Sequence, residues 1–442
     1  MGPRRREGKR KKEIVIRKIL ITIWEFFLSV RTPVAHACTL PTDMHKLLLI
    51  AALAALPAGA SLAQSAAPVT AAPAARQQAA LTVAQVTGHY ADLVYAGYSD
   101  SLASAQAMQQ AITRLLAQPS AQTLAAARKA WLQARDIYGQ TEAFRFYDGP
   151  IDNEDGPEGR INAWPMDESY VDYVQGNAKA GIINERQQPI TAEALSELNE
   201  KDGEENIATG WHAIEFLLWG QDLSATGPGA RPHTDFVTGK KANADRRRQY
   251  LQVVTDLLIE DLATVRTAWA PAVAKNYRAE FVASGNEAIR KIFVGLGSLS
   301  RGELAGERLE VALASQDQED EHSCFSDNTH NDAIANAQGI ENVWLGQYRR
   351  LDGSLLRGPG LRDWVAQKNA ALAQETTAHI HQSVAAARQI PTPFDQAIQG
   401  QRSSPARAKI QATIDSLIQQ SKDLAASAQA VGIARLNIVQ PE

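Results

Sequence analysis

The chain has 442 residues, with 45 Lys and Arg, 49 Asp and Glu, and 45% hydrophobic residues. This length exceeds what one hydrophobic core usually serves, and the apolar fraction excludes wholesale disorder and the collagen-like and disulfide-scaffold classes. Residues 1–63 carry a net charge of +7 (11 basic, 4 acidic) and the remainder carries −11 (34 basic, 45 acidic), so a cation is a more natural ligand than nucleic acid.

The N-terminal region predicts targeting rather than folded structure. From Met44 the sequence has a short basic start, an apolar run over 47–56 and small residues up to Ala63, which is typical of a cleaved secretory signal peptide. Residues 1–43 are interpreted as an over-extended N-terminus, because their apolar stretch is too short to span a bilayer. Residues 64–82 are expected to be a flexible leader. We therefore expect a periplasmic protein without a transmembrane helix in the mature chain, with outer-membrane association as the alternative.

Past residue 82 the apolar residues recur at spacings of three and four, which predicts amphipathic helices nearly throughout. Runs of alternating β-branched residues are nearly absent, so no substantial sheet is expected. The expected fold class is therefore all-α. The clearest apolar stripes run over 102–116, 124–141, 250–269 and 410–431.

Segments rich in Gly, Pro, Asp and Asn interrupt these helices at 148–167, 220–245, 317–332 and 346–362. The second of them is the longest near the middle of the chain. It predicts a boundary between an N-terminal helical bundle over 83–240 and a C-terminal helical bundle over 241–442. A weak similarity between 205–222 and 333–348 points to a distant duplication of the bundle.

The strongest chemical pattern is Gly-Trp-His-Ala-Ile-Glu at 210–215. His212 and Glu215 stand three residues apart, so on a helix they share a face, and their apolar neighbours place that face toward a core. A buried imidazole beside a buried carboxylate needs a compensating partner, and a divalent metal ion is one. A hydrogen-bonded His–Glu pair without metal is equally compatible with this spacing.

Two further carboxylates are candidate metal ligands. Glu142, on a helix predicted over 124–147, follows Tyr138 by four residues and so lies on or beside the apolar stripe. Carboxylates on facing helices are how bundle cores hold iron or manganese. Asp167 either adds a carboxylate to the metal or begins the next helix. One imidazole with several carboxylates suits a single iron or zinc ion with open positions.

The segment 321–330 gathers many polar side chains. Its composition is compatible with a nucleophile made of Cys324 and His322 or His330, and with a second metal site made of His322, Asp327 and His330. We favour a third interpretation, in which this segment is a hydrogen-bonded connection that caps the helix opening near residue 331. Residues that are neighbours in the sequence seldom have side chains that face each other, as a catalytic Cys–His pair requires.

Four segments in order make this chain similar to the imelysin family, which includes iron-regulated bacterial surface and periplasmic proteins and an insulin-cleaving metallopeptidase. The resemblance runs from about residue 85 to the C-terminus. It implies two α-helical bundles with a G-x-H-x-x-E site near their junction, and a metal ion on His212, Glu215 and Glu142. The four segments are 131–152, 159–174, 210–220 and 318–346.

This resemblance implies either metal binding in iron acquisition or hydrolysis of polypeptides by a metallopeptidase. The sequence has no His-Glu-x-x-His string, and Glu215 cannot easily serve as both metal ligand and general base. We therefore expect an exported metal-binding protein, with an iron-uptake system as a partner. The metallopeptidase is the alternative, in which a peptide is the substrate and His212 and Glu215 are catalytic.

Overall fold

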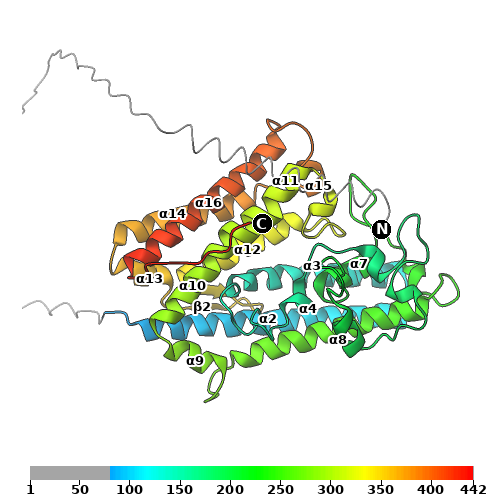
Figure 1. The fold of residues 1–442 in the computed structure, drawn as a ribbon, viewed down its shortest axis with the longest axis horizontal. Coiled ribbons are helices and arrows are strands. Elements are labelled where there is room, and N and C mark those ends of the chain that lie inside the picture. Colours follow the sequence, from blue (N-terminus) through cyan, green and yellow to red (C-terminus); the bar gives the residue numbers. More distant parts are fainter. Residues whose placement is uncertain (1–79, 442) are drawn as a thin grey trace, which may run out of the picture. The chain divides into compact units, whose positions relative to one another are not determined.

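The computed structural model describes residues 80–441, and these belong to one compact unit. This part of the chain is mostly helical, which confirms the all-α class predicted from the apolar periodicity (Figure 1). The predictions for residues 1–79, which concern the over-extended start, the signal peptide and most of the leader, lie outside the described residues.

The first half of the described chain contains two long helices before residue 142 and a series of short ones after it. The first helix begins at a capping box in which Thr82 and Gln85 exchange hydrogen bonds, which satisfies free N–H groups of the first turn. The elements are α2 (Val83–Ala117), α3 (Ala121–Thr141), the 3-10 turn η1 (Glu142–Phe144), α4 (Glu158–Asn162), α5 (Glu168–Val171), η2 (Ile182–Asn184), α6 (Ala192–Leu198), α7 (Gly210–Trp219) and η3 (His233–Phe236).

The second half contains most of the longer helices and a short hairpin. Its last long helix starts with Ser404 as N-cap and Pro405 in the first turn, a favoured combination. The elements are α8 (Ala244–Ala268), α9 (Tyr277–Ala283), α10 (Asn286–Ser298), the π-helix η4 (Leu299–Glu310), α11 (Val311–Ser315), η5 (Gln318–Asp320), α12 (Thr329–Leu345), β1 (Gln347–Arg349), β2 (Leu355–Arg357), α13 (Leu361–Ala366), α14 (Ala370–Ala387), α15 (Phe394–Ala397) and α16 (Pro405–Ala430).

The long helices pack in two groups that meet at α3 and α12 (Figure 1). In the first group α2 packs against α3 and α8, and α7 packs against both α3 and α8. In the second group α16 packs against α14, α10 and η4, while α12 packs against α14. Helix α8 lies after the boundary predicted at residue 240, yet it packs against α2, which lies before that boundary. The division at 240 and the duplication of a bundle remain predictions.

The apolar stripes form the core, as the periodicity predicts. On α3 the stripe residues Leu124, Trp131 and Tyr138 are all buried, and the indole of Trp131 meets that of Trp211 edge to face. Burying one large apolar side chain stabilises a fold by about 1.5–3 kcal/mol, so such stripes hold the helices together. This packing brings α7 against α3, which positions the candidate site.

The helix predicted over 124–147 is shorter in the structure. It ends at Thr141 and continues as one 3-10 turn, because the chain bends so that the Asp152 carboxylate accepts hydrogen bonds from the backbone N–H of Phe146 and Gly149. Phe146 adopts a left-handed conformation with φ of 70°, which an α-helix does not allow. Glu142 therefore follows the end of the regular helix, at its C-cap.

Strand structure is confined to one hairpin within the described residues. β1 and β2 pair antiparallel, with Tyr348 opposite Leu356, inside the segment 346–362 that the sequence assigns to a loop. Gly346 precedes the hairpin with φ of +66°, a conformation that glycine adopts without strain. Within residues 80–441 no helix is long and apolar enough to cross a membrane.

Candidate functional site

Helix α7 is buried along its whole length, which is why the candidate site lies inside the protein. It starts at Gly210, where φ is +82° and a Cβ would stand 2.4 Å from the carbonyl oxygen of Ile161. Only glycine permits this close approach to α4. His212 and Glu215 are 2% and 0% exposed, so both polar side chains depend on partners inside the protein.

The structure brings His212 and Glu215 together, as the i, i+3 spacing predicts. Nδ1 of His212 lies 3.0 Å from Oε2 of Glu215. The other carboxylate oxygen, Oε1, accepts hydrogen bonds from the backbone N–H (3.0 Å) and the hydroxyl (2.7 Å) of Ser326. Burial raises the pKa of Glu215 to about 8, although both hydrogen bonds from Ser326 favour the carboxylate form.

A second histidine, His322, lies beside the first. The two imidazole rings meet edge to face with their centroids 4.9 Å apart. Nδ1 of His322 lies 2.9 Å from Oδ2 of Asp332, which also accepts a hydrogen bond from the hydroxyl of Ser323. The pKa of both imidazoles is lowered well below its usual range, first by burial and then by nearby arginines. Each histidine is therefore half of a buried carboxylate–histidine pair.

Arg135 completes the arrangement from helix α3. Its Nη2 lies 3.4 Å from Nε2 of His212 and 3.2 Å from Nε2 of His322, while its Nε lies 3.2 Å from Oδ1 of Asp332. Because guanidinium nitrogens only donate, Nε2 of His212 accepts in this contact, which leaves its Nδ1–H to donate to Glu215. We call these five residues, Arg135, His212, Glu215, His322 and Asp332, the polar centre.

Glu142 is buried but engages arginines rather than the polar centre. Its two oxygens accept a forked pair of hydrogen bonds from Arg308, with Nη1 at 3.1 Å and Nη2 at 2.5 Å, and Arg145 adds a contact of 3.2 Å. Burial by itself would raise the pKa of Glu142, but Arg308 and Arg145 hold it at about 2. The described contacts make Glu142 the partner of an internal ion pair.

Asp167 lies at the start of the short helix α5. Its carboxylate accepts hydrogen bonds from the backbone N–H (3.1 Å) and the hydroxyl (2.6 Å) of Ser169, which is the geometry of a helix cap. This matches the second of the two roles that the sequence allows for Asp167.

The segment 321–330 contributes His322 to the polar centre, while Cys324 and His330 have other surroundings. Burial and nearby carboxylates raise the pKa of the Cys324 thiol well above its usual range, which disfavours a thiolate nucleophile. Nδ1 of His330 lies 3.1 Å from the carbonyl oxygen of Asp327. The following helix starts at Thr329, and its N-cap Asn328 makes no side-chain capping bond.

Within residues 80–441 no group of three or more His, Cys, Asp or Glu side chains is arranged to hold one metal ion. In the polar centre the reason is visible in the contacts. Nη2 of Arg135 lies between the two rings, 3.4 Å from Nε2 of His212 and 3.2 Å and 3.4 Å from Nε2 and Nδ1 of His322, and the carboxylates of Glu215 and Asp332 contact the Nδ1 atoms. The side chains around Nη2 of Arg135 that could bind a metal ion are thus two imidazoles, and neither carboxylate is directed there.

The sequence contains a signal for Arg135 that lies outside the motifs named above. Arg135 stands four residues after Trp131 and three before Tyr138, so a charged residue occupies a position of the apolar stripe. A charged side chain in such a place must find a buried partner. No local sequence pattern, in contrast, connects Asp332 and His322 with the motif at 210–215, because the fold brings them together.

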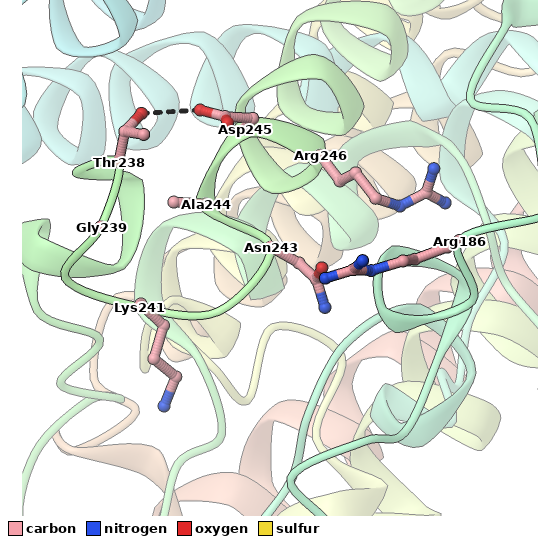
Figure 2. A pocket seen from close by; sticks show the side chains of 8 residues that line it. All are labelled: Arg186, Thr238, Gly239, Lys241, Asn243, Ala244, Asp245 and Arg246. Carbon is pink, nitrogen blue, oxygen red and sulfur yellow. Dashed lines mark hydrogen bonds between the residues drawn. The ribbon is translucent and has the colours of Figure 1, made fainter.

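A cavity of about 430 Å³ lies elsewhere, at the N-terminus of α8 (Figure 2). On one side Thr238 donates a hydrogen bond to Asp245, and on the other lie Arg186 and Arg246. The Arg246 guanidinium is already bound to backbone carbonyl groups of 182–188. The lining residues are Arg186, Thr238, Gly239, Lys241, Asn243, Ala244, Asp245 and Arg246, so the cavity contains no residue of the polar centre.

Comparisons with known proteins agree on one family. The family described as imelysin matches residues 94–424. "Iron-regulated protein A" of Synechococcus elongatus is 29% identical over 332 residues, which cover 72% of this chain and 78% of that protein.

Two crystal structures share the fold. A putative iron-regulated protein A precursor from Parabacteroides distasonis has a TM-score of 0.62 at 18% identity, covering 80% of this chain and 97% of that one. An imelysin-like protein from Psychrobacter arcticum has a TM-score of 0.57 at 16% identity, covering 79% and 96%.

Proposed function

We propose, from the premise that this chain belongs to the imelysin family, that it is an exported protein of iron acquisition which binds a metal ion as cargo at the polar centre. The observation that carries this proposal is the contact of two adjacent buried imidazoles, those of His212 and His322, with the same Nη2 atom of Arg135. The name of the relative, iron-regulated protein A, supports iron as the metal.

The two carboxylate–histidine pairs have the arrangement that commonly supports metal-binding imidazoles. A histidine that binds a metal through one nitrogen usually donates the other N–H to a carboxylate, which fixes the tautomer and orients the ring. His212 has this relation to Glu215, and His322 has it to Asp332. We therefore propose that the imidazoles bind the ion and that Glu215 orients His212, a role different from the direct ligand expected from the sequence.

Arg135 is the internal competitor for this ion. Its guanidinium carries a fixed positive charge between the two imidazole rings. A metal cation binds there only when Nη2 withdraws. An ion held by two imidazoles keeps several coordination positions open, which suits an ion that is taken up and passed on. Imidazole nitrogen binds both iron and zinc.

The substitution His212→Ala is expected to weaken the binding of Fe²⁺ or Zn²⁺ by more than about 100-fold, because it removes a ligand. Glu215→Gln is expected to weaken it only by about 10- to 100-fold, the usual effect of losing a group that orients a ligand. Isothermal titration calorimetry and the metal content of the purified protein measure both effects.

The matched control is His381→Ala, because His381 is an exposed histidine whose Nδ1 contacts Glu341 on the surface. Its metal binding should equal that of the unsubstituted protein. A protein that binds neither metal, or a His212→Ala variant that binds as well as the parent, contradicts the proposal. That result would leave the hydrogen-bonded His–Glu pair as the explanation of the motif.

The metallopeptidase alternative has less support in the geometry. A general base needs an oxygen directed at the attacking water. Both oxygens of Glu215 accept hydrogen bonds, from His212 and Ser326, and the side chain is fully buried. An assay for cleavage of an unfolded polypeptide on the same preparation tests this alternative directly.

Export to the periplasm is proposed from the signal-peptide pattern at 44–63. We expect the mature protein to begin at Gln64, because cleavage follows Ala63. N-terminal sequencing of the protein recovered from the periplasmic fraction checks this, and a mature N-terminus before Met44 would contradict both the export signal and the over-extended start.

A further inference from the structure

Among the described residues, Trp164 is the only tryptophan that neither belongs to the hydrophobic core nor packs against it. It is half-buried, and its ring meets the imidazole of His322 edge to face, with the two centroids 5.0 Å apart. Trp364 is half-buried as well, but it packs against the core. The remaining tryptophans of this part of the chain are buried members of the core: Trp131, Trp211, Trp219, Trp269 and Trp344.

Trp164 is also the neighbour through which the polar centre is connected with the protein surface. The five residues of the polar centre are at most 2% exposed. Within residues 80–441, the side chains that hydrogen-bond to them or form ring contacts with them are buried, and only Trp164 is half-buried. The buried neighbours are Tyr138, Asn162, Ser323 and Ser326.

The connection that carries Trp164, between α4 and α5, is held at its ends but not in its middle. Asn162, the last residue of α4, accepts a hydrogen bond from Nη1 of Arg135, and the N–H of Asp167 donates to the carbonyl oxygen of Glu205 (2.7 Å). Residues 163–166 form no hydrogen bond with the described part of the chain. Outward movement of the indole therefore breaks no hydrogen bond there.

An ion that is taken up and passed on has to reach this buried site, so one of the neighbouring side chains has to move. Segments with few buried apolar contacts and few backbone hydrogen bonds open at the lowest cost in free energy. Trp164 meets both conditions, since it lies outside the core on a connection without hydrogen bonds. The helices that carry Arg135, His212 and Asp332 do not, because their hydrogen-bond ladders hold them.

We infer that Trp164 is the gate of the polar centre, an inference that rests on the function proposed above. Its indole closes the way between solvent and His322, and the ion enters or leaves when the ring turns outward. A segment that covers a buried site governs the rate of entry and release. Trp164 therefore controls how fast the ion is exchanged, whereas His212 and His322 control how tightly it is held.

Modification by diethyl pyrocarbonate, which reacts with neutral imidazole, tests the gate without any metal. We expect His322 to be protected in the parent, because Trp164 covers it. In Trp164→Ala its rate of modification should rise by about 10-fold or more, since opening of the cover no longer limits the reaction. Mass spectrometry of the peptide that contains His322 measures this rate. The exposed His381 should react equally in both proteins and serves as an internal standard.

Stopped-flow mixing with Zn²⁺ or Fe²⁺ tests the consequence for the ion. Trp164→Ala should raise the rates of association and dissociation by about 10-fold each and change the affinity by less than about twofold, because a gate acts on both directions alike. A residue that only supports the structure of the site would instead lower the affinity. Circular dichroism checks that the variant folds.

Two further variants make the result specific. Trp364→Ala removes a half-buried tryptophan of α13 and should leave both the protection of His322 and the metal rates unchanged. Trp164→Phe keeps an aromatic ring at the gate and should keep most of the protection.

The inference is overturned if His322 stays as protected in Trp164→Ala as in the parent, or if Trp364→Ala exposes it equally. It is also overturned if Trp164→Ala loses metal affinity while its association rate is unchanged. If the parent binds neither metal, the proposed function fails, and the modification of His322 still decides whether Trp164 closes the polar centre.

Discussion

Arg308→Met is expected to lower the free energy of unfolding by about 3–5 kcal/mol, the usual cost of leaving one partner of a buried ion pair unpaired. Arg308 is buried and forms a two-pronged contact with Glu142, and its Nη2 also reaches Glu303 at 2.8 Å. Met keeps much of the aliphatic volume but supplies no charge. Denaturation by urea, with the slope of the transition compared between proteins, measures the loss.

The double variant Glu142→Gln/Arg308→Met provides the control. Removing both charges takes away the stranded carboxylate, so the double variant should recover part of the stability that Arg308→Met loses. A loss below about 1 kcal/mol for Arg308→Met alone would contradict the role of this pair, because surface substitutions already reach about 0.5 kcal/mol.

The ion pair of Glu142 and Arg308 also makes the stability of the protein depend on pH. The pKa of Glu142 in the folded protein, about 2, is below its ordinary value of 4.5, so the carboxylate stabilises the fold above pH 4.5. This contribution, of the order of 3 kcal/mol, disappears as the pH falls from 4.5 to 2. Glu142→Gln lacks this contribution, so its unfolding energy should vary less with pH across that range than that of the parent.

Arg135→Met is expected to raise the affinity of the polar centre for Fe²⁺ or Zn²⁺ by about 100-fold or more. In the parent, a metal ion must displace Nη2 of Arg135 from the point between His212 and His322. A fixed positive charge about 4 Å from a unit charge costs about 4 kcal/mol in a partly screened protein interior, so removing it favours a cation strongly. Titration calorimetry with each metal measures the change.

Arg128→Met is the matched control on the same helix. Arg128 donates to the carbonyl oxygens of Leu218 and Arg231 and lies over the ring of Trp219, away from the two histidines. Its substitution should leave metal affinity unchanged. If Arg135→Met folds, as circular dichroism would show, and still binds metal no better than the parent, Arg135 does not compete with the ion.

Local sequence patterns predicted the helices and the first half of the polar centre, because these depend on spacing along one helix. The stripe on α3 and the His212–Glu215 contact both follow from helix geometry, in which residues three or four apart share a face. The hairpin of β1 and β2 was not predicted, since strands of three residues are too short for an alternating pattern to be recognised.

The rest of the polar centre depends on contacts between distant segments. His322 is 110 positions beyond His212, in an irregular connection, and contacts between distant segments bring the two rings together: α12 packs against α3, and Ser326 donates to Glu215. Glu142, expected on or beside the apolar stripe, is buried, and its partner Arg308 lies 166 positions further along the chain. A sequence pattern shows that such a carboxylate needs a partner, but does not identify that partner.

The π-helical geometry of η4 makes the position of Arg308 depend on chain length as well as on residue identity. A π-helix bonds each N–H to the carbonyl five residues earlier, so its turns are wider than those of an α-helix. If η4 adopted ordinary α-helical bonding with its length unchanged, each residue would turn the helix further, by about 100°, and the guanidinium of Arg308 would rotate away from Glu142. The width of the π-helical turns in η4 is therefore part of what places the Arg308 guanidinium against Glu142.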